Sequence, residues 1–176
     1  TSQYEISIDG RTSLRQKSSG VVVCSGTGST SWYRNIVGIS TRTASHVLQI
    51  ASHLTADGQV VASSVDAIGG RPEHPSFSAV DPAEAERLAA VYNASLRFHP
   101  EDNRLAYAVR DPVCNAIFNV DNPSGFATNI QVRSLMLDAQ LVFDGGYTFP
   151  FPRGSIAEFS IDPADALHCI RIAKET

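Results

Sequence analysis

The alternation of apolar and polar residues at the start of the chain predicts a strand that ends in a tight turn. Residues 4–10, YEISIDG, alternate between the two classes and end in Asp9-Gly10, a pair that favours hairpin turns. Residues 20–24, GVVVC, form a short β-branched run that is typical of a strand buried on both faces. A stretch rich in glycine, serine and threonine follows directly, and residues 32–36 fit one or two helical turns.

Two longer helices are predicted in the middle of the chain. Residues 43–54 have helical spacing with Thr43 at the N-cap, and Asp81-Pro82 with Glu84 forms a capping pattern for a second helix. The core-facing residues are expected to be Ala44, Val47, Leu48, Ala51 and Leu54 in the first helix, and Leu88, Val91, Tyr92 and Leu96 in the second. Residues 57–76 carry several glycines and prolines and predict a mobile connection between the two helices.

After His99 the pattern changes to short strands separated by turn residues. The predicted strands are residues 105–110, 114–120, 130–137, 140–144, 147–151, 156–161 and 167–172. Many short strands at regular intervals are typical of a sandwich-like β fold. We therefore expect one α+β domain over residues 1–176, mainly β, with its helices in one inserted segment at about residues 31–97.

Composition and charge support a folded domain and limit its partners. Of the 176 residues 43% are hydrophobic, which is enough to bury a core. Fourteen Lys and Arg against 18 Asp and Glu give a net charge of −4, so no electrostatic attraction to nucleic acid or to a membrane surface is expected. No apolar run approaches the ~20 residues that a membrane helix needs. The three cysteines form no CxxC pair, which favours a reducing compartment.

The glycine-rich stretch at residues 26–31, GTGSTS, is the first candidate site. It has no lysine after the glycines, so it is not a Walker A phosphate loop, and glycine stands where a GxSxG nucleophile elbow has its serine. Backbone N–H groups at such a helix start, together with the hydroxyls of Ser29, Thr30 and Ser31, can bind an anion or the polar edge of a heterocycle. A capped turn without a ligand is the alternative interpretation.

The other candidate sites have weaker patterns. Cys24 or Cys169 could pair with a histidine in a catalytic dyad, although buried structural cysteines are the more common case. His46 and His53 lie about two turns apart on the predicted helix, unlike the i, i+4 spacing of metal ligands. Taken alone, Asp144-Gly145-Gly146 is an ordinary hairpin turn.

Two motifs, taken together, resemble the C-terminal domain of the NAD kinase family. Residues 16–36, QKSSGVVVCSGTGSTSWYRNI, contain TGSTSW, which is similar to the family's TGSTAY-type motif after a strand. Residues 142–161 resemble the second hallmark, a strand followed by a DGQ-type turn, here Asp144-Gly145-Gly146. A literal DGQ at residues 57–59 follows a predicted helix and lies in the wrong context. The tryptophan of TGSTSW, the opening strand and the long helical insertion are similar to the mitochondrial type of NAD kinase found in animals.

The resemblance implies a fold, a reaction and a location. It implies a β-sandwich like that of the NAD kinase C-terminal domain, which binds NAD and dimerises. It also implies transfer of the γ-phosphoryl group of ATP, with Mg²⁺, to the adenosine 2′-hydroxyl of NAD, giving NADP. The expected partner is a second copy of the chain, and the expected location is the mitochondrion.

The resemblance also implies which residues line the NAD site. They are Thr30, Ser31, Trp32, Asn35, Ser29 and Ser19, with Asp144 and Gly145 in the motif turn. Ser19 stands where bacterial-type members have an aspartate, so this contact lacks the charged acceptor. The family's GGDG motif, which carries the catalytic aspartate, and its Asn-Glu pair are not in the chain. We expect both upstream of Thr1 in a longer protein, and we expect no catalytic residue and no kinase activity in this chain alone.

Three other functions remain open from the sequence. A related lipid or sphingoid kinase would share the general architecture. A non-catalytic module could bind NAD or dimerise only. A cysteine or serine hydrolase would use Cys24 or Ser29 as its nucleophile.

Overall fold

A computed structural model describes residues 1–52, 80–115, 118 and 122–166 of the chain. It forms two compact units: the β unit, Thr1–Val37 with Arg97–Thr176, and the helical unit, Gly38–Leu96. The predicted insertion at about residues 31–97 therefore begins too early. Residues 32–37 form a short helix that packs on the strands of the β unit and belongs to it. The mixture of helices with antiparallel sheets confirms the predicted α+β class.

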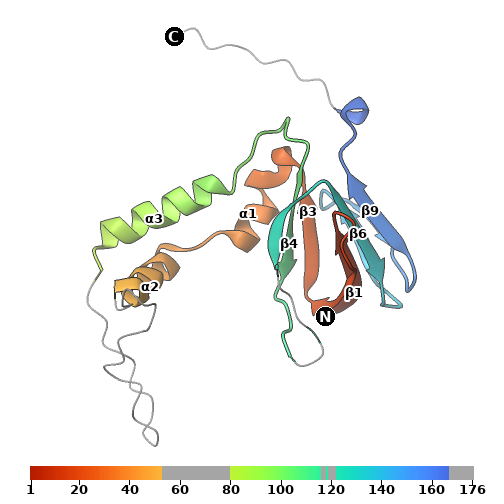
Figure 1. Cartoon of the computed structure of the whole chain (residues 1–176), viewed down its shortest axis with the longest axis horizontal. Helices are drawn as coiled ribbons and strands as arrows, with labels where there is room; N and C mark the ends of the chain where they lie inside the picture. Colours follow the sequence, from red (N-terminus) through yellow and green to blue (C-terminus); the bar gives the residue numbers. More distant parts are fainter. Residues whose placement is uncertain (53–79, 116–117, 119–121, 167–176) are drawn as a thin grey trace, which may run out of the picture. The chain divides into compact units, whose positions relative to one another are not determined.

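The first sheet of the β unit has four antiparallel strands in the order β2-β1-β6-β9 (Figure 1). Their bounds are β1 Ser2–Ile8, β2 Leu14–Ser18, β6 Asn129–Ser134 and β9 Ile156–Ser160. The predicted turn between β1 and β2 is confirmed, because Asp9 and Gly10 both have positive φ, at 49° and 71°.

Strand β2 was not predicted, because its buried face is polar. Gln16 and Ser18 are 3% and 0% exposed, whereas Leu14 is 44% exposed. The hydroxyl of buried Tyr4 donates to Gln16 Oε1 at 3.3 Å and lies 2.8 Å from Ser18 Oγ. These hydrogen bonds make burial of the polar side chains tolerable, so the inward face of β2 lacks the apolar residues by which a half-buried strand is recognised.

The second sheet has the order β3-β4-β5, and β7 and β8 form a separate ribbon. The bounds are β3 Gly20–Cys24, β4 Leu105–Arg110, β5 Ser124–Ala127, β7 Gln140–Phe143 and β8 Tyr147–Pro150. The strand predicted at 105–110 is confirmed, and β5 was missed. Residues 114, 115 and 118 are not in a strand, and the rest of the strand predicted at 114–120 and all of that at 167–172 lie outside the described residues.

Side chains from both sheets meet in one apolar core. Tyr4, Ile6 and Ile130 from the first sheet pack with Leu105, Tyr107 and Ala127 from the second. The prediction that β3 is buried on both faces is wrong, since all five of its residues are half-buried. Among the described elements, helix α1 (Trp32–Val37) and the 3₁₀ turn η1 (Gly26–Thr30) pack against β3 and β4 from outside the two sheets, and both are too short to cover the strand.

The helical unit contains α2, Thr41–Ser52, and α3, Pro82–Ser95. Asp81 caps α3 as predicted, because its Oδ1 accepts the Ala83 N–H at 3.0 Å. The cap predicted for α2 is wrong: the helix begins before Thr43, and Ser40 Oγ accepts the Thr43 N–H at 3.0 Å. The connection predicted at 57–76, with Leu54 and His53, lies outside the described residues.

The two helices pack through small residues, and this corrects part of the predicted core. Ala44, Ala85 and Ala89 are buried, as predicted for Ala44, whereas Val47 and Val91 are 51% and 68% exposed. Alanine side chains let two helices approach closely, so larger neighbours on the same helices lie at the edge of the contact.

Candidate functional site

The glycine-rich stretch folds into a 3₁₀ turn, η1 (Gly26–Thr30), followed by α1. Gly26 lies against the backbone of residues 99 and 100, because a Cβ there would be 2.2 Å from the His99 carbonyl oxygen. The hydroxyl of Ser29 is buried and donates to the Gly26 carbonyl at 2.6 Å. Ser29 therefore stabilises the turn, and its only described hydrogen bond is internal.

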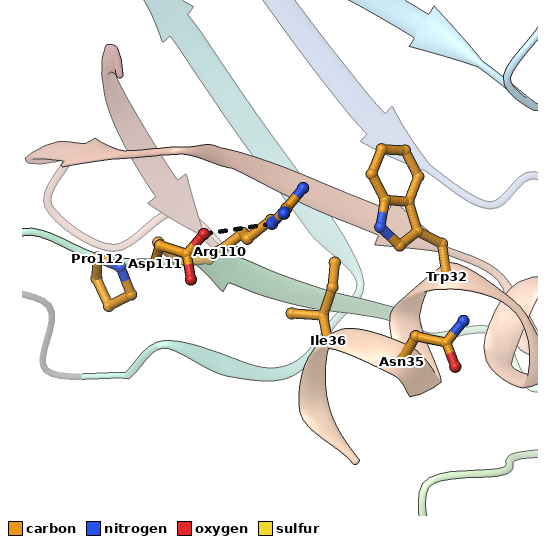
Figure 2. A pocket seen from close by; sticks show the side chains of 7 residues that line it. Trp32, Asn35, Ile36, Arg110, Asp111 and Pro112 are labelled. Atoms are coloured by element: carbon orange, nitrogen blue, oxygen red, sulfur yellow. Dashed lines mark ion pairs between the residues drawn. The ribbon is translucent and has the colours of Figure 1, made fainter. Parts of the chain in front are cut away.

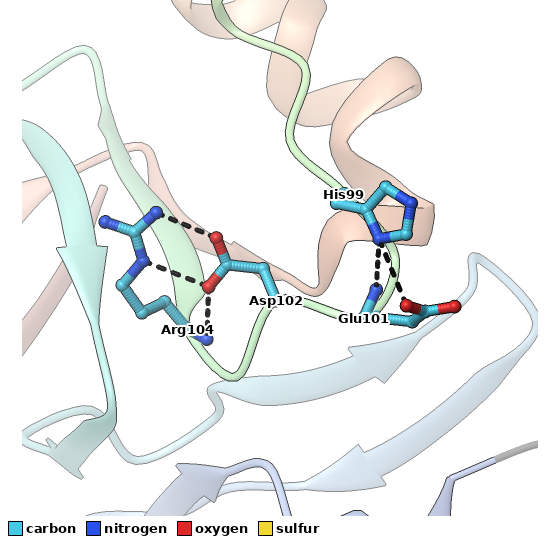
Figure 3. A network of polar contacts seen from close by, with 4 residues as sticks. All are labelled: His99, Glu101, Asp102 and Arg104. Atoms are coloured by element: carbon cyan, nitrogen blue, oxygen red, sulfur yellow. Dashed lines mark hydrogen bonds and ion pairs between the residues drawn. The ribbon is translucent and has the colours of Figure 1, made fainter.

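A short polar network lies in the segment against which Gly26 packs (Figure 3). Asp102 accepts from Arg104 Nη2 at 2.7 Å and Nε at 3.0 Å. These hydrogen bonds from Arg104 lower the pKa of Asp102 to about 2. The Arg104 guanidinium also lies 4.7 Å from the centre of the Phe126 ring. The network fixes the loop before β4 and so supports the position of the turn.

Helix α1 has a part-exposed face that carries both apolar and polar side chains. Trp32, Asn35 and Ile36 share this face by their i, i+3 and i+4 spacing. Trp32 is 56% exposed, while Tyr33 is only 4% exposed and holds the helix to the β unit. An exposed indole beside an exposed amide offers a flat apolar surface and hydrogen-bonding groups to a ligand.

An open pocket of about 520 Å³ lies between α1 and the end of β4 (Figure 2). It is lined by Trp32, Asn35, Ile36, Val109, Arg110, Asp111 and Pro112. The structure thus brings two of the predicted site residues, Trp32 and Asn35, to one pocket. The volume falls in the range of small-molecule sites.

The other predicted residues do not line this pocket. Thr30 and Ser31 are exposed in η1 and at the start of α1. Ser19 lies next to the pocket residue Arg110, because the Ser19 backbone N–H donates to the Arg110 carbonyl at 2.9 Å. Asp144 and Gly145 form the turn of the β7–β8 ribbon, with φ of 48° and 69°. This turn has the hairpin geometry that its sequence favours.

Arg110 was not among the predicted site residues. In the sequence it stands at the end of an apolar strand and before Asp111-Pro112, a pattern that indicates only a turn. Its Nε lies 3.3 Å from Asp111 Oδ2, and Asp111 has φ of 47°. The proximity of Arg110 to Trp32 depends on how α1 packs on β4, which no local pattern specifies.

Cys24 is half-buried at the end of β3, and burial raises the pKa of its thiol to about 11. At pH 7.5 almost none of it is thiolate, the reactive form. We therefore expect iodoacetamide to label Cys24 much more slowly than the exposed Cys114, as measured by peptide mass mapping over time. Labelling of Cys24 at least as fast as Cys114 would contradict this expectation and would favour the hydrolase interpretation.

Within the part of the chain that the structure describes, no group of three or more His, Cys, Asp or Glu is placed to hold a metal ion. No helix in this part is both long and apolar enough to span a membrane.

Comparisons with known proteins point to one kind of relative, although no family model matches the chain. It is 34% identical over 167 residues to "NAD kinase 2, mitochondrial" of Xenopus tropicalis, covering 94% of this chain and 34% of that protein. The identity to the protein of the same name from Homo sapiens is 32% over 169 residues, covering 96% of this chain and 34% of the relative. The Mus musculus protein is 31% identical over the same length. The chain thus spans about a third of the length of the curated relatives that it matches.

Proposed function

We propose that the chain is the NAD-binding part of a longer NAD kinase, because it is similar over nearly its whole length to proteins named "NAD kinase 2, mitochondrial", as its two motifs indicated. The whole protein would transfer the γ-phosphoryl group of ATP to the adenosine 2′-hydroxyl of NAD, giving NADP. The observation that carries the proposal is the similarity itself, which extends over 94% or more of this chain.

The chemistry of the pocket supports NAD as the ligand. The exposed face of Trp32 can stack on a flat heteroaromatic ring, and NAD contains two such rings. The Asn35 amide can both donate to and accept from a ring amide or a ribose hydroxyl. We propose Trp32 and Asn35 as the principal contacts, with Thr30, Ser31 and Ser19 beside them. For Ser29 we propose a supporting role, because its hydroxyl is already bonded to Gly26.

The phosphoryl donor and its metal are proposed to bind mainly outside this chain. The chain has no GGDG sequence, and its described residues form no metal-binding cluster. ATP would supply the phosphoryl group and Mg²⁺ would neutralise phosphate charge. The contribution of this chain would be to bind and orient NAD, since phosphoryl transfer depends on positioning of the acceptor as well as on stabilisation of phosphate charge.

The assembly and location are also proposals. We propose a homodimer, as the family resemblance implies. We further propose that the protein acts in mitochondria, because the relatives are named mitochondrial.

An assay of NADP formation tests the proposal. We expect the whole protein to convert NAD and ATP to NADP, and we expect the 176-residue chain alone to form none, because it lacks the GGDG aspartate. NADP is measured by an enzymatic cycling assay, with sphingosine as a parallel substrate. NADP formation by the chain alone would contradict the proposal that ATP and its metal bind mainly outside this chain. A whole protein that phosphorylates sphingosine but not NAD would favour the lipid kinase alternative.

A further inference from the structure

Arg110 is a pocket residue whose side chain has room to bind a ligand. It is the last residue of β4, and its partner across the sheet is Gly20, which has no side chain to cover it. A Cβ added to Gly20 would meet no atom within 4 Å, so the space beside this pair is open. The Arg110 side chain is 52% exposed, and Figure 2 shows its guanidinium end directed toward the side of the pocket where Trp32 lies.

The neighbouring carboxylate takes only one of the guanidinium's donors. Asp111 Oδ2 lies 3.3 Å from Nε, on the inner edge of the group. A guanidinium has five N–H donors, four of them on its two terminal nitrogens. Within the described part of the chain these terminal nitrogens have no protein partner. Arg15 and Arg104, in contrast, each lie over a phenylalanine ring.

From this arrangement we infer that Arg110 binds a phosphate of the dinucleotide, and that Asp111 is a positioning residue for it. The inference rests on the proposed function for the identity of the ligand. Two terminal nitrogens in one plane match two phosphate oxygens, which is why arginine is common in phosphate sites. Among the described residues that line the pocket, Arg110 is the one cationic side chain, and NAD brings a diphosphate whose negative charge favours such a partner.

The two sides of the pocket offer different kinds of contact to a ligand. Trp32 and Asn35 lie on α1 and offer stacking and amide contacts, while Arg110 lies on β4 and offers charge-assisted donors. The Asp111 carboxylate offsets the charge of Arg110 at long range. Binding therefore depends on directed hydrogen bonds from the terminal nitrogens more than on attraction at a distance.

The test is direct binding of NAD to the whole protein without ATP, by calorimetry, for wild type, Arg110→Gln and Arg110→Lys. We expect Arg110→Gln to raise the Kd for NAD roughly tenfold to thirtyfold, because charge-assisted hydrogen bonds are lost. Arg110→Lys keeps the charge but not the planar fork, so its Kd should lie between the other two. Arg133→Gln is the matched control, since its side chain is 50% exposed and its Nε likewise lies near a carboxylate, that of Glu5, but it does not line the pocket.

A second ligand pair separates phosphate binding from stacking. Nicotinamide mononucleotide carries a phosphate and nicotinamide riboside does not, so Arg110→Gln should weaken only the first. The inference would be overturned if Arg110→Gln weakened the binding of both ligands equally or left the Kd for NAD unchanged. It would also be overturned if Arg110→Lys bound NAD as weakly as Arg110→Gln. NADP formation by wild type reports on the proposed function separately. A wild type that binds NAD through Arg110 but forms no NADP would refute the kinase and leave this inference standing.

Discussion

A Gly26→Ala substitution is expected to destabilise the β unit by about 3 kcal/mol or more. The new Cβ would lie 2.2 Å from the His99 carbonyl oxygen, 2.6 Å from its carbon and 2.8 Å from Pro100 Cα. All three atoms belong to backbone, so no side chain can rotate away and the chain itself must move. Overpacking of this kind commonly lowers stability by about 1–3 kcal/mol. Because the contacted atoms are rigid backbone, we expect the loss for Gly26→Ala to lie at or above the upper end of that range, at about 3 kcal/mol.

Two other glycines provide graded controls for this substitution. A Cβ at Gly28 would lie 2.9 Å from Cys24 Cβ, a single side-chain contact, so Gly28→Ala should cost less. A Cβ at Gly146 would meet nothing within 4 Å, and Gly146→Ala should change stability by no more than about 1 kcal/mol. Urea unfolding followed by circular dichroism measures all three variants. A Gly26→Ala protein as stable as Gly146→Ala would mean that this turn does not pack against residues 99 and 100.

The second large effect is expected for Trp32→Ala in the whole protein. Removal of the indole should lower kcat/KM for NAD roughly 30- to 150-fold, which corresponds to about 2–3 kcal/mol of lost stacking and apolar contact. The loss should fall mainly on KM, because Trp32 is proposed to bind NAD in the ground state as well as the transition state. Since the indole is 56% exposed, the variant should remain folded.

Two further variants make the Trp32 experiment specific. Trp32→Tyr restores a flat ring and should keep most of the affinity. Cys24→Ala changes the strand before the turn, outside the pocket, and should leave kcat/KM nearly unchanged. Steady-state kinetics with NAD varied at saturating ATP measures each one. A wild-type KM for NAD in Trp32→Ala would mean that this tryptophan does not bind NAD. A large loss of kcat/KM in Cys24→Ala would favour a catalytic role for the thiol.

Several features could be predicted because their cause is local. Asp9-Gly10 and Asp144-Gly145 form turns with positive φ, a conformation that these residues tolerate in short stretches. Asp81 caps α3 through an N–H only two residues away. The strand at 105–110 is apolar along most of its length, because it lies at the centre of its sheet and packs on the core. The two motifs likewise identified the relatives, since each is a short stretch of sequence.

Other features depended on contacts between distant parts of the chain. The polar residues of β2 could be assigned to the core only once Tyr4 was seen to hydrogen-bond them. The valines of α2 and α3 were predicted to be buried, but the alanines form the contact between the helices and the valines are exposed.

The sequence by itself determined the turns, the cap of α3, the central strand and the similarity to proteins named NAD kinase 2, because each rests on neighbouring residues. It also provided Trp32 and Asn35, one helical turn apart. Only the tertiary structure placed Arg110 in the same pocket, through the packing of α1 on β4. That packing joins a helix with a buried Tyr33 to a strand far along the chain, and no periodicity of the sequence encodes which strand end meets which helix face.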